Sequence, residues 1–247
     1  MSDLIEVTGV SKAFGGVQAN RDVSLKVEAG KITGLIGPNG SGKTTLFNSI
    51  VGYHPIDNGS IRFEGQEISR LRVPQIARLG LLRTFQQTRI YSKMDCVQNM
   101  LISLPHRRAG WGSMFTPFEP ELMDKAEHLL EFVGLYAKRR LISGDLSFGQ
   151  QKLLEFAMAL MNEPKVLLLD EPTAGINPTL INGLIDRLKR ANEEFGITLF
   201  VIEHNMRVIM NLAENIYCLA HGELLAEGHP AEIQNDQRVI DAYLGAH

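Results

Sequence analysis

The chain has 247 residues, 44% of them hydrophobic and 21% charged, a balance typical of an ordinary globular protein with one or two compact units. Its formal net charge of −3 provides no basic surface of the kind that nucleic-acid binding needs, so we expect no nucleic-acid partner. The two cysteines, Cys96 and Cys218, give neither a disulfide framework nor a metal-ligand spacing. No apolar run approaches the ~18–20 residues of a membrane span, and the N-terminus has no signal-peptide pattern.

The N-terminal part of the chain predicts strands around a glycine-rich loop. Leu4–Val10 and Val23–Val27 alternate between apolar and polar residues like short strands, with Gly15-Gly16 as the turn signal between them. Lys31–Ile36 is an apolar strand that enters the loop, and Thr45–Val51 is a helix that leaves it. Beyond this unit we expect four further elements: a turn at 57–60, a strand at 61–63, a short helix at 74–79 and a strand at 80–85.

The loop itself, Gly37-Pro-Asn-Gly-Ser-Gly-Lys-Thr44, matches the P-loop pattern G-x-x-x-x-G-K-[S/T]. Backbone N–H groups of such a loop wrap the phosphates of ATP or GTP, its lysine reaches the β- and γ-phosphates, and its Thr hydroxyl ligates Mg²⁺. The phosphates then lie at a helix N-terminus, which favours anions. The alternative is a glycine-rich turn that matches by chance. The residues predicted to bind the nucleotide are Gly37, Pro38, Asn39, Gly40, Ser41, Gly42, Lys43, Thr44 and Thr45, with Thr44 also a metal ligand.

Helical patterns follow, from about residue 88 to 161. Glu121–Val133 carries an amphipathic stripe, and Gln150–Met161 is apolar nearly all round. Continuous apolar runs at Lys165–Leu169 and Ile197–Ile202 are typical of parallel strands covered on both faces, with Asn177 as the N-cap of a helix between them. We predict an α/β fold. Its P-loop core, about 1–87 and 163–247, has a mixed sheet and an antiparallel β subdomain, and a helical subdomain is inserted at about 88–162.

Two further segments have residues suited to phosphoryl transfer. Asp170 and Glu171 end a buried strand, where ligands bind in open α/β sheets. Asp170 can hold Mg²⁺ and Glu171 can act as general base toward water, unless both merely cap the next turn. Ser147 with Gln150 three residues later fits a capping box. Capping does not explain Gly149 in the first turn of the helix, where glycine is a poor helix former. Close approach of the backbone to an anion would explain it.

The P-loop, Leu146-Ser-Phe-Gly-Gln150, Leu169-Asp-Glu-Pro-Thr173 and a histidine after a strand occur in that order. Over essentially the whole chain this set resembles the nucleotide-binding subunit of ATP-binding cassette (ABC) transporters. The resemblance implies an ATPase that uses ATP and Mg²⁺. By position, His204 resembles the switch histidine that contacts the γ-phosphate, and Phe14 resembles the aromatic residue that stacks on adenine; a core or turn role is the alternative for Phe14.

Gln86 resembles the glutamine that touches Mg²⁺ and the attacking water, with Gln87 as the alternative register. Ser147 and Gly149 resemble the signature residues that contact the γ-phosphate from the opposite subunit. Phe148 stands where the commonest signature has glycine, and we expect activity to survive this difference. Ala174–Asn177 resembles the loop that crosses the dimer interface, although many members have Asp at its last position.

Only one P-loop and one signature occur, whereas the family closes each ATP between the P-loop of one subunit and the signature of another. The resemblance therefore implies a second ABC ATPase subunit, identical or related. It also implies two transmembrane permeases, a periplasmic or extracellular solute-binding protein acting indirectly, and a peripheral position on the cytoplasmic face of the membrane. ATP would bridge the closed dimer, and its hydrolysis would release it.

The finer pattern resembles the ATPases of importers for branched-chain and other hydrophobic amino acids. The segments that carry this resemblance are Ile76–Gly80, Arg83–Gln87, the aromatic signature, Ala174–Pro178, Val201–Met206 and the Pro105–Pro120 loop with Trp111, Phe115 and Phe118. Substrate choice resides in other subunits, so an importer of urea, amides or another solute is an alternative.

The helical subdomain is expected to accept a short permease helix in a groove, with Ile90, Tyr91 and Met94 as candidate floor residues or as ordinary core. Two other classes stay open. One is a soluble ABC-type ATPase acting on DNA or ribosomes, which usually has two cassettes or a long coiled coil. The other is a protein that holds ATP without turnover, against which Glu171 argues.

Overall fold

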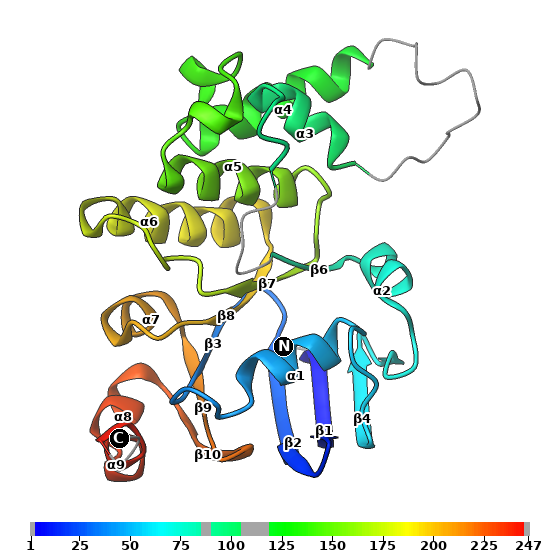
Figure 1. Ribbon diagram of the computed structural model, residues 1–247, viewed down its shortest axis with the longest axis vertical. Helices are drawn as coiled ribbons and strands as arrows, with labels where there is room; N and C mark the ends of the chain where they lie inside the picture. Colours follow the sequence, from blue (N-terminus) through cyan, green and yellow to red (C-terminus); the bar gives the residue numbers. More distant parts are fainter. Residues whose placement is uncertain (1–2, 85–89, 105–118, 245–247) are drawn as a thin grey trace. The chain divides into compact units, whose positions relative to one another are not determined.

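The computed structural model describes residues 3–84, 90–104 and 119–244, and the chain divides into two compact units (Figure 1). The core unit comprises Met1–Arg83, Lys165–Thr173 and Leu188–His247. The helical unit comprises Thr84–Pro164 and Ala174–Arg187. The second unit therefore includes the first half of helix α6 (Pro178–Phe195), whereas the sequence pattern predicts this helix wholly in the core.

The N-terminal part of the core unit is a four-stranded antiparallel sheet of order β2-β1-β4-β5. Its strands are β1 (Asp3–Phe14), β2 (Val17–Glu28), β4 (Asn58–Phe63) and β5 (Gln66–Glu67). Gly15 and Gly16, both at positive φ, connect the paired residues Phe14 and Val17. This confirms the predicted turn, because a two-residue hairpin of this kind favours glycine.

One predicted turn in this sheet is wrong. Residues 58–60 belong to β4, where Asn58 pairs with Ser11 and Ser60 pairs with Thr8. A Cβ on Gly59 would lie 2.4 Å from the carbonyl oxygen of Gly9. The glycine therefore allows close approach of two strands, and its turn-like composition has a packing cause.

The second sheet has six strands in the order β10-β9-β3-β8-β7-β6. All neighbours are parallel except β9 and β10. Every residue of β3, β7 and β8 is buried, as their continuous apolar composition predicted. The bounds are β3 Ile32–Ile36, β6 Leu81–Arg83, β7 Val166–Asp170, β8 Thr198–Ile202, β9 Asn215–Ala220 and β10 Glu223–Gly228.

The core unit also has short helices, and its apolar interior includes the rings of Phe47 and Phe200 with centroids 4.8 Å apart. The helix bounds are α1 Lys43–Ile50, α2 Val73–Leu79, α7 Met206–Leu212, α8 Pro230–Asn235, α9 Gln237–Leu244 and the second half of α6, Pro178–Phe195. The predicted strand at 80–85 is too long: β6 covers only Leu81–Arg83, and Gly80 instead ends α2 in a left-handed conformation.

The parallel order has a direct consequence for function. The carboxyl ends of β3, β8, β7 and β6 lie at the same edge of the sheet, which is where ligands bind in open α/β folds. The residues at those ends are Gly37, Glu203, Asp170 and Arg83.

The helical unit contains α3 (Cys96–Ile102), α4 (Pro120–Phe132), α5 (Phe148–Leu160) and two short 3-10 helices, Tyr136–Lys138 and Ser143–Asp145. The predicted amphipathic stripe lies on α4 and the following residue, with Ala126, Leu129, Leu130 and Val133 all buried. Helix α3 packs against α4 and α5. Phe85, Gln86 and Gln87 and nearly all of the 105–120 loop lie outside the described residues.

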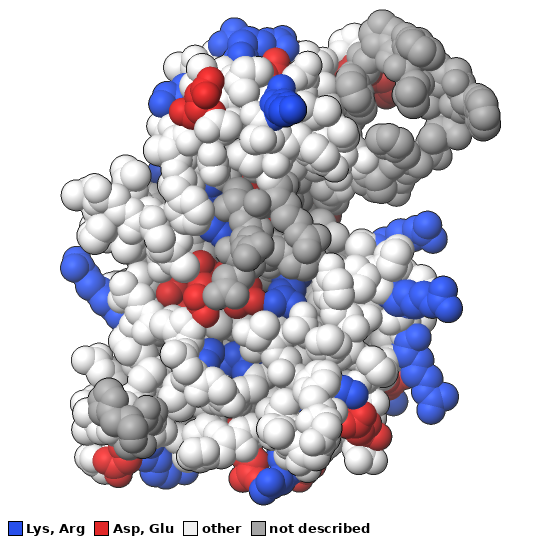
Figure 2. Space-filling view, viewed as in Figure 1, with Lys and Arg blue, Asp and Glu red and all other residues white. Residues whose placement is uncertain are grey.

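Surface charge on the core unit is uneven. Figure 2 shows Lys and Arg side chains projecting along the edge that carries α2 and β4, where Arg62, Arg70, Arg72 and Arg78 are exposed. The small net charge therefore conceals a local basic edge. Within the described residues, no helix is long and apolar enough to cross a membrane.

Candidate functional site

The glycine-rich loop follows β3, and two of its glycines are required by the backbone. Gly37 (φ 145°) and Gly42 (φ 98°) adopt conformations that L side chains rarely take. A Cβ on Gly37 would lie 2.1 Å from the carbonyl oxygen of Leu219, and one on Gly42 would lie 2.2 Å from that of Ala19. The loop is thus packed tightly against backbone on two sides, which fixes the position of the N-terminus of α1.

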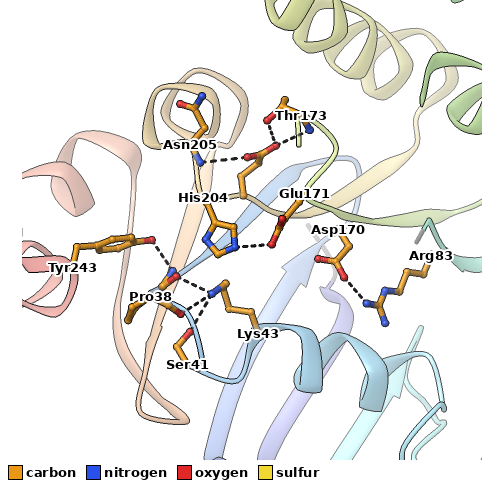
Figure 3. A network of polar contacts seen from close by, with 12 residues as sticks. Pro38, Ser41, Lys43, Arg83, Asp170, Glu171, Thr173, His204, Asn205 and Tyr243 are labelled. Carbon is orange, nitrogen blue, oxygen red and sulfur yellow. Dashed lines mark hydrogen bonds and ion pairs between the residues drawn. The ribbon is translucent and has the colours of Figure 1, made fainter. Parts of the chain in front are cut away.

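Lys43 is buried and folds back over the loop. Its Nζ donates to the carbonyl oxygens of Gly37 at 2.8 Å and Pro38 at 2.9 Å, and to Ser41 Oγ at 3.3 Å (Figure 3). Burial lowers the pKa of Lys43, and the nearby charge of Glu171 opposes that shift. A buried ammonium with only neutral acceptors is suited to exchange them for an anion.

Asp170 ends β7 and forms a buried ion pair that the sequence pattern did not predict. Arg83, at the end of β6, donates to Asp170 Oδ2 and to Asn48 Oδ1 on α1, both at 2.5 Å. Both members of the ion pair are almost completely buried. Asp170 Oδ1 has no hydrogen-bond partner among the described residues. An unpartnered carboxylate oxygen in a buried site is what a hard divalent cation prefers, so this donor set fits Mg²⁺.

Glu171 and His204 lie together at the same edge. His204 Nε2 is 2.6 Å from Glu171 Oε1, and since a carboxylate only accepts, the ring N–H is the donor (Figure 3). Glu171 has φ 50°, a left-handed conformation that is uncommon for a residue other than glycine. Such strain at a residue proposed as a general base is typical of functional sites. Glu171 therefore has a side-chain partner on the segment that follows β8, beyond the turn at Pro172-Thr173.

Glu203 is a buried carboxylate beside His204. It accepts hydrogen bonds from Thr173 N–H at 3.0 Å, from Thr173 Oγ1 at 2.6 Å and from Asn205 N–H at 3.4 Å. These bonds tie the segment after Glu171 to the segment that carries His204. Glu203 therefore helps to keep the Glu171–His204 pair together.

Phe14 lies at the surface of the core unit. Its side chain is 43% exposed, it packs edge-on against His54, and Lys12 Nζ lies 5.2 Å from its ring. This exposure excludes the core alternative, and the turn alternative stays open because Phe14 directly precedes Gly15-Gly16. Thr44, Asn39 and Gly40 are likewise exposed, whereas Ser41 is buried in the loop.

In the helical unit, Ser147 caps α5. Its Oγ accepts from Gln150 N–H at 3.4 Å, and the Gln150 side chain accepts from Ser147 N–H at 3.1 Å, so the capping box is present. A Cβ on Gly149 would meet Leu180 and Ile176 only at ordinary contact distances of 3.4 and 3.7 Å. Nothing described within the unit therefore requires glycine at position 149.

The loop before α6 adjoins the aromatic signature residue. Gly175 (φ 74°) lies so close to Phe148 that a Cβ would be 2.8 Å from its ring. Asn177 Oδ1 accepts from Thr179 N–H at 3.1 Å, which confirms the predicted N-cap.

Sequence reasoning missed four residues of this site: Asn48, Arg83, Glu203 and Tyr243. Arg83 ends β6 and Glu203 directly follows β8, so both are charged residues at the carboxyl ends of parallel strands, a signal that could have singled them out. Asn48 and Tyr243 carry no such signal, because each reaches the site only through tertiary contacts.

Comparisons with known proteins identify the class. A family model described as ABC transporter matches residues 20–174, and one described as branched-chain amino acid ATP-binding cassette transporter matches residues 223–247. The chain belongs to the ABC transporter family of ATP-binding proteins, the cassette ATPases that bind nucleotide, and its α/β fold is that of their P-loop core.

The particular relatives include an amino-acid transport protein and two solved cassette structures. The high-affinity branched-chain amino acid transport ATP-binding protein BraF of Pseudomonas aeruginosa is 38% identical over 98% of both chains. The solved ADP conformation of MJ1267, an ATP-binding cassette of an ABC transporter, matches with TM-score 0.90 and 33% identity over 99% of this chain and all of that one. The dimeric post-hydrolysis structure of the cassette MJ0796, bound to ADP and Pi, matches with TM-score 0.78 and 25% identity over 92% of this chain and 98% of the other.

Proposed function

We propose that this protein is the ATP-hydrolysing subunit of a membrane importer for branched-chain amino acids and that it acts at the cytoplasmic face of the membrane. The observation that carries the proposal is the meeting of Lys43, Asp170 and the Glu171–His204 pair at one edge of the six-stranded sheet. The match of residues 223–247 to the branched-chain amino acid model supports the choice of solute.

Phosphate binding follows from the loop geometry. The phosphates of ATP meet the N-terminus of α1, where residues 39–45 supply backbone N–H groups and the Thr44 and Thr45 hydroxyls. Pro38 has no N–H, and the Gly37 N–H is bound to Tyr243. Lys43 exchanges the carbonyls of Gly37 and Pro38 for phosphate oxygens, because a charge-assisted bond is stronger than a neutral one. Phe14 offers its exposed ring to the adenine.

Hydrolysis then needs a base and a group that orients it. Glu171 accepts the proton of the attacking water, and His204 holds the Glu171 carboxylate through the bond at 2.6 Å. Thr44 and Asp170 would hold Mg²⁺, with Gln86 as a further ligand, and when bound the ion neutralises developing phosphate charge. Arg83 keeps the Asp170 carboxylate in place through its Oδ2 atom, which leaves Oδ1 available.

The signature residues act in a second copy or a related cassette. Ser147 and Phe148 are exposed, and the lack of an internal reason for Gly149 supports a requirement imposed from outside the chain. A phosphate that approaches the N-terminus of α5 from another subunit needs the space that a Cβ at position 149 would fill. We therefore propose that the two units form one nucleotide-binding domain and that two such domains close over ATP.

The contact with the permeases is proposed for the segment 90–94 of the helical unit. Buried Asn99 holds this segment, accepting from Tyr91 N–H at 2.7 Å and donating to Tyr91 O at 3.1 Å. Gly144 N–H donates to Ser92 O, so the segment adjoins Ile142 and Ser143. Tyr91 and Ile142 are 54% and 42% exposed, and such fixed apolar groups suit a docking helix.

Replacing Glu171 with Gln tests the proposal. The variant should bind ATP, form dimers in its presence and lose turnover by at least ~100-fold. Glu131→Gln makes the same chemical change on an exposed residue of α4 and should leave the rate within about twofold. An unchanged rate in Glu171→Gln would remove Glu171 from the mechanism.

A further inference from the structure

The C-terminal helix α9 contributes a side chain to the phosphate loop. Gly37 N–H donates a hydrogen bond of 2.8 Å to the hydroxyl oxygen of Tyr243, 206 positions further along the chain. Figure 3 shows the tyrosine ring pointing into the loop from the side opposite Asp170. This residue lies within the segment that matches the branched-chain amino acid family model.

Gly37 is held on three sides, and two of them come from the C-terminal part of the chain. Its N–H is bound by Tyr243, its Cα faces the carbonyl of Leu219 on β9, and its own carbonyl accepts from Lys43 Nζ. Since Gly37 is buried, its N–H needs an acceptor, and the tyrosine supplies it. The position of the first loop residue thus depends on α9.

Helix α9 is itself anchored in the core unit. Val239 is 2% exposed, and the helix packs against α8 and β10. The Tyr243 hydroxyl is neutral at physiological pH and does not repel phosphate; burial raises its pKa further, to about 12. A neutral acceptor fits a loop whose remaining groups attract anions.

We propose that Tyr243 is a positioning residue of the nucleotide site and that α9 sets the nucleotide affinity of the loop by holding Gly37. The proposal rests on nucleotide binding at this loop. Without the hydroxyl, the Gly37 peptide has no fixed acceptor, and the loop occupies its binding conformation for a smaller fraction of the time. The apparent affinity for nucleotide is the intrinsic affinity multiplied by that fraction, so it decreases in proportion. By reciprocity, a bound nucleotide stabilises α9.

Tyr243→Phe tests the proposal, with Tyr217→Phe as its matched control. The Tyr217 hydroxyl also lies in the core unit, accepting from Lys26 N–H at 3.2 Å and donating to Lys26 O at 3.0 Å, but its partner is on β2. Both variants thus remove one tyrosine hydroxyl bound to backbone. The dissociation constant of a fluorescent ADP analogue is measured in EDTA by anisotropy, so neither metal nor turnover contributes.

Tyr243→Phe should raise the dissociation constant by about 5- to 30-fold, and Tyr217→Phe should change it by less than about twofold. Hydrogen–deuterium exchange should show faster exchange of the Gly37 amide in Tyr243→Phe alone. In turnover assays with ATP, KM should rise while kcat at saturation stays within about twofold. Equal effects of the two variants would overturn the role of Tyr243.

Two measurements keep the test independent of folding. Val239→Ala, which loosens α9, should weaken ADP binding in the same direction as Tyr243→Phe. In the wild-type chain, ADP should slow exchange of the α9 amides, and unchanged exchange would overturn the coupling even if Tyr243→Phe does not fold. Failure of the wild-type chain to bind the analogue would instead contradict the proposed function.

Discussion

The buried pair of Arg83 and Asp170 makes a strong prediction for stability. Arg83→Met keeps an unbranched apolar stem but removes the guanidinium, which leaves the Asp170 carboxylate buried without its cation and Asn48 without a donor. Breaking a buried pair in this way costs about 3–5 kcal/mol in the free energy of unfolding. For a chain of this size that corresponds to a decrease in Tm of about 6–20 °C.

Thermal unfolding followed by circular dichroism measures this loss. Arg21→Met is the matched control, because Arg21 pairs with Glu223 in the same unit with both side chains more than half exposed. It should cost less than about 1 kcal/mol. In the double variant Arg83→Met/Asp170→Asn, removal of the unpaired charge should recover about 1–3 kcal/mol relative to the sum of the single changes. An Arg83→Met protein as stable as Arg21→Met would refute the reasoning.

Two further predictions concern glycines. Gly42→Ala should lower Tm by at least ~6 °C and abolish nucleotide binding, because the new Cβ would lie 2.2 Å from a backbone carbonyl oxygen. Gly40→Ala is the control: its Cβ would have no atom within 4 Å, so it should cost only about 1 kcal/mol in the free energy of unfolding. Thermal unfolding and ADP titration measure both variants, and equal losses would contradict the steric argument. Gly149→Ala should leave Tm within about 2 °C but reduce ATPase activity and ATP-dependent dimerisation at least ~10-fold. Phosphate release measures the activity, and size-exclusion chromatography measures the dimers. A variant that stays active and dimerises would show that no partner subunit approaches position 149.

Local patterns in the chain anticipated much of the fold and part of the site. The hairpin at Gly15-Gly16, the fully buried strands β3, β7 and β8, and the caps at Ser147 and Asn177 all depend on residues close together in sequence. The phosphate loop could be recognised for the same reason, because its residue pattern is consecutive in the sequence. The interpretation of Gly59 failed because the reason for that glycine lies on another strand.

The amino-acid sequence by itself determined the family, the phosphate loop and the residues Asp170, Glu171 and His204 as candidates. Only the tertiary structure decided which residues hold this site by hydrogen bonds: Arg83 binds Asp170, Glu203 binds Thr173, and Tyr243 binds Gly37. The physical reason is strand order. Since β8 lies between β3 and β7, and α9 returns to the loop, these partners meet through long-range packing that no local periodicity encodes.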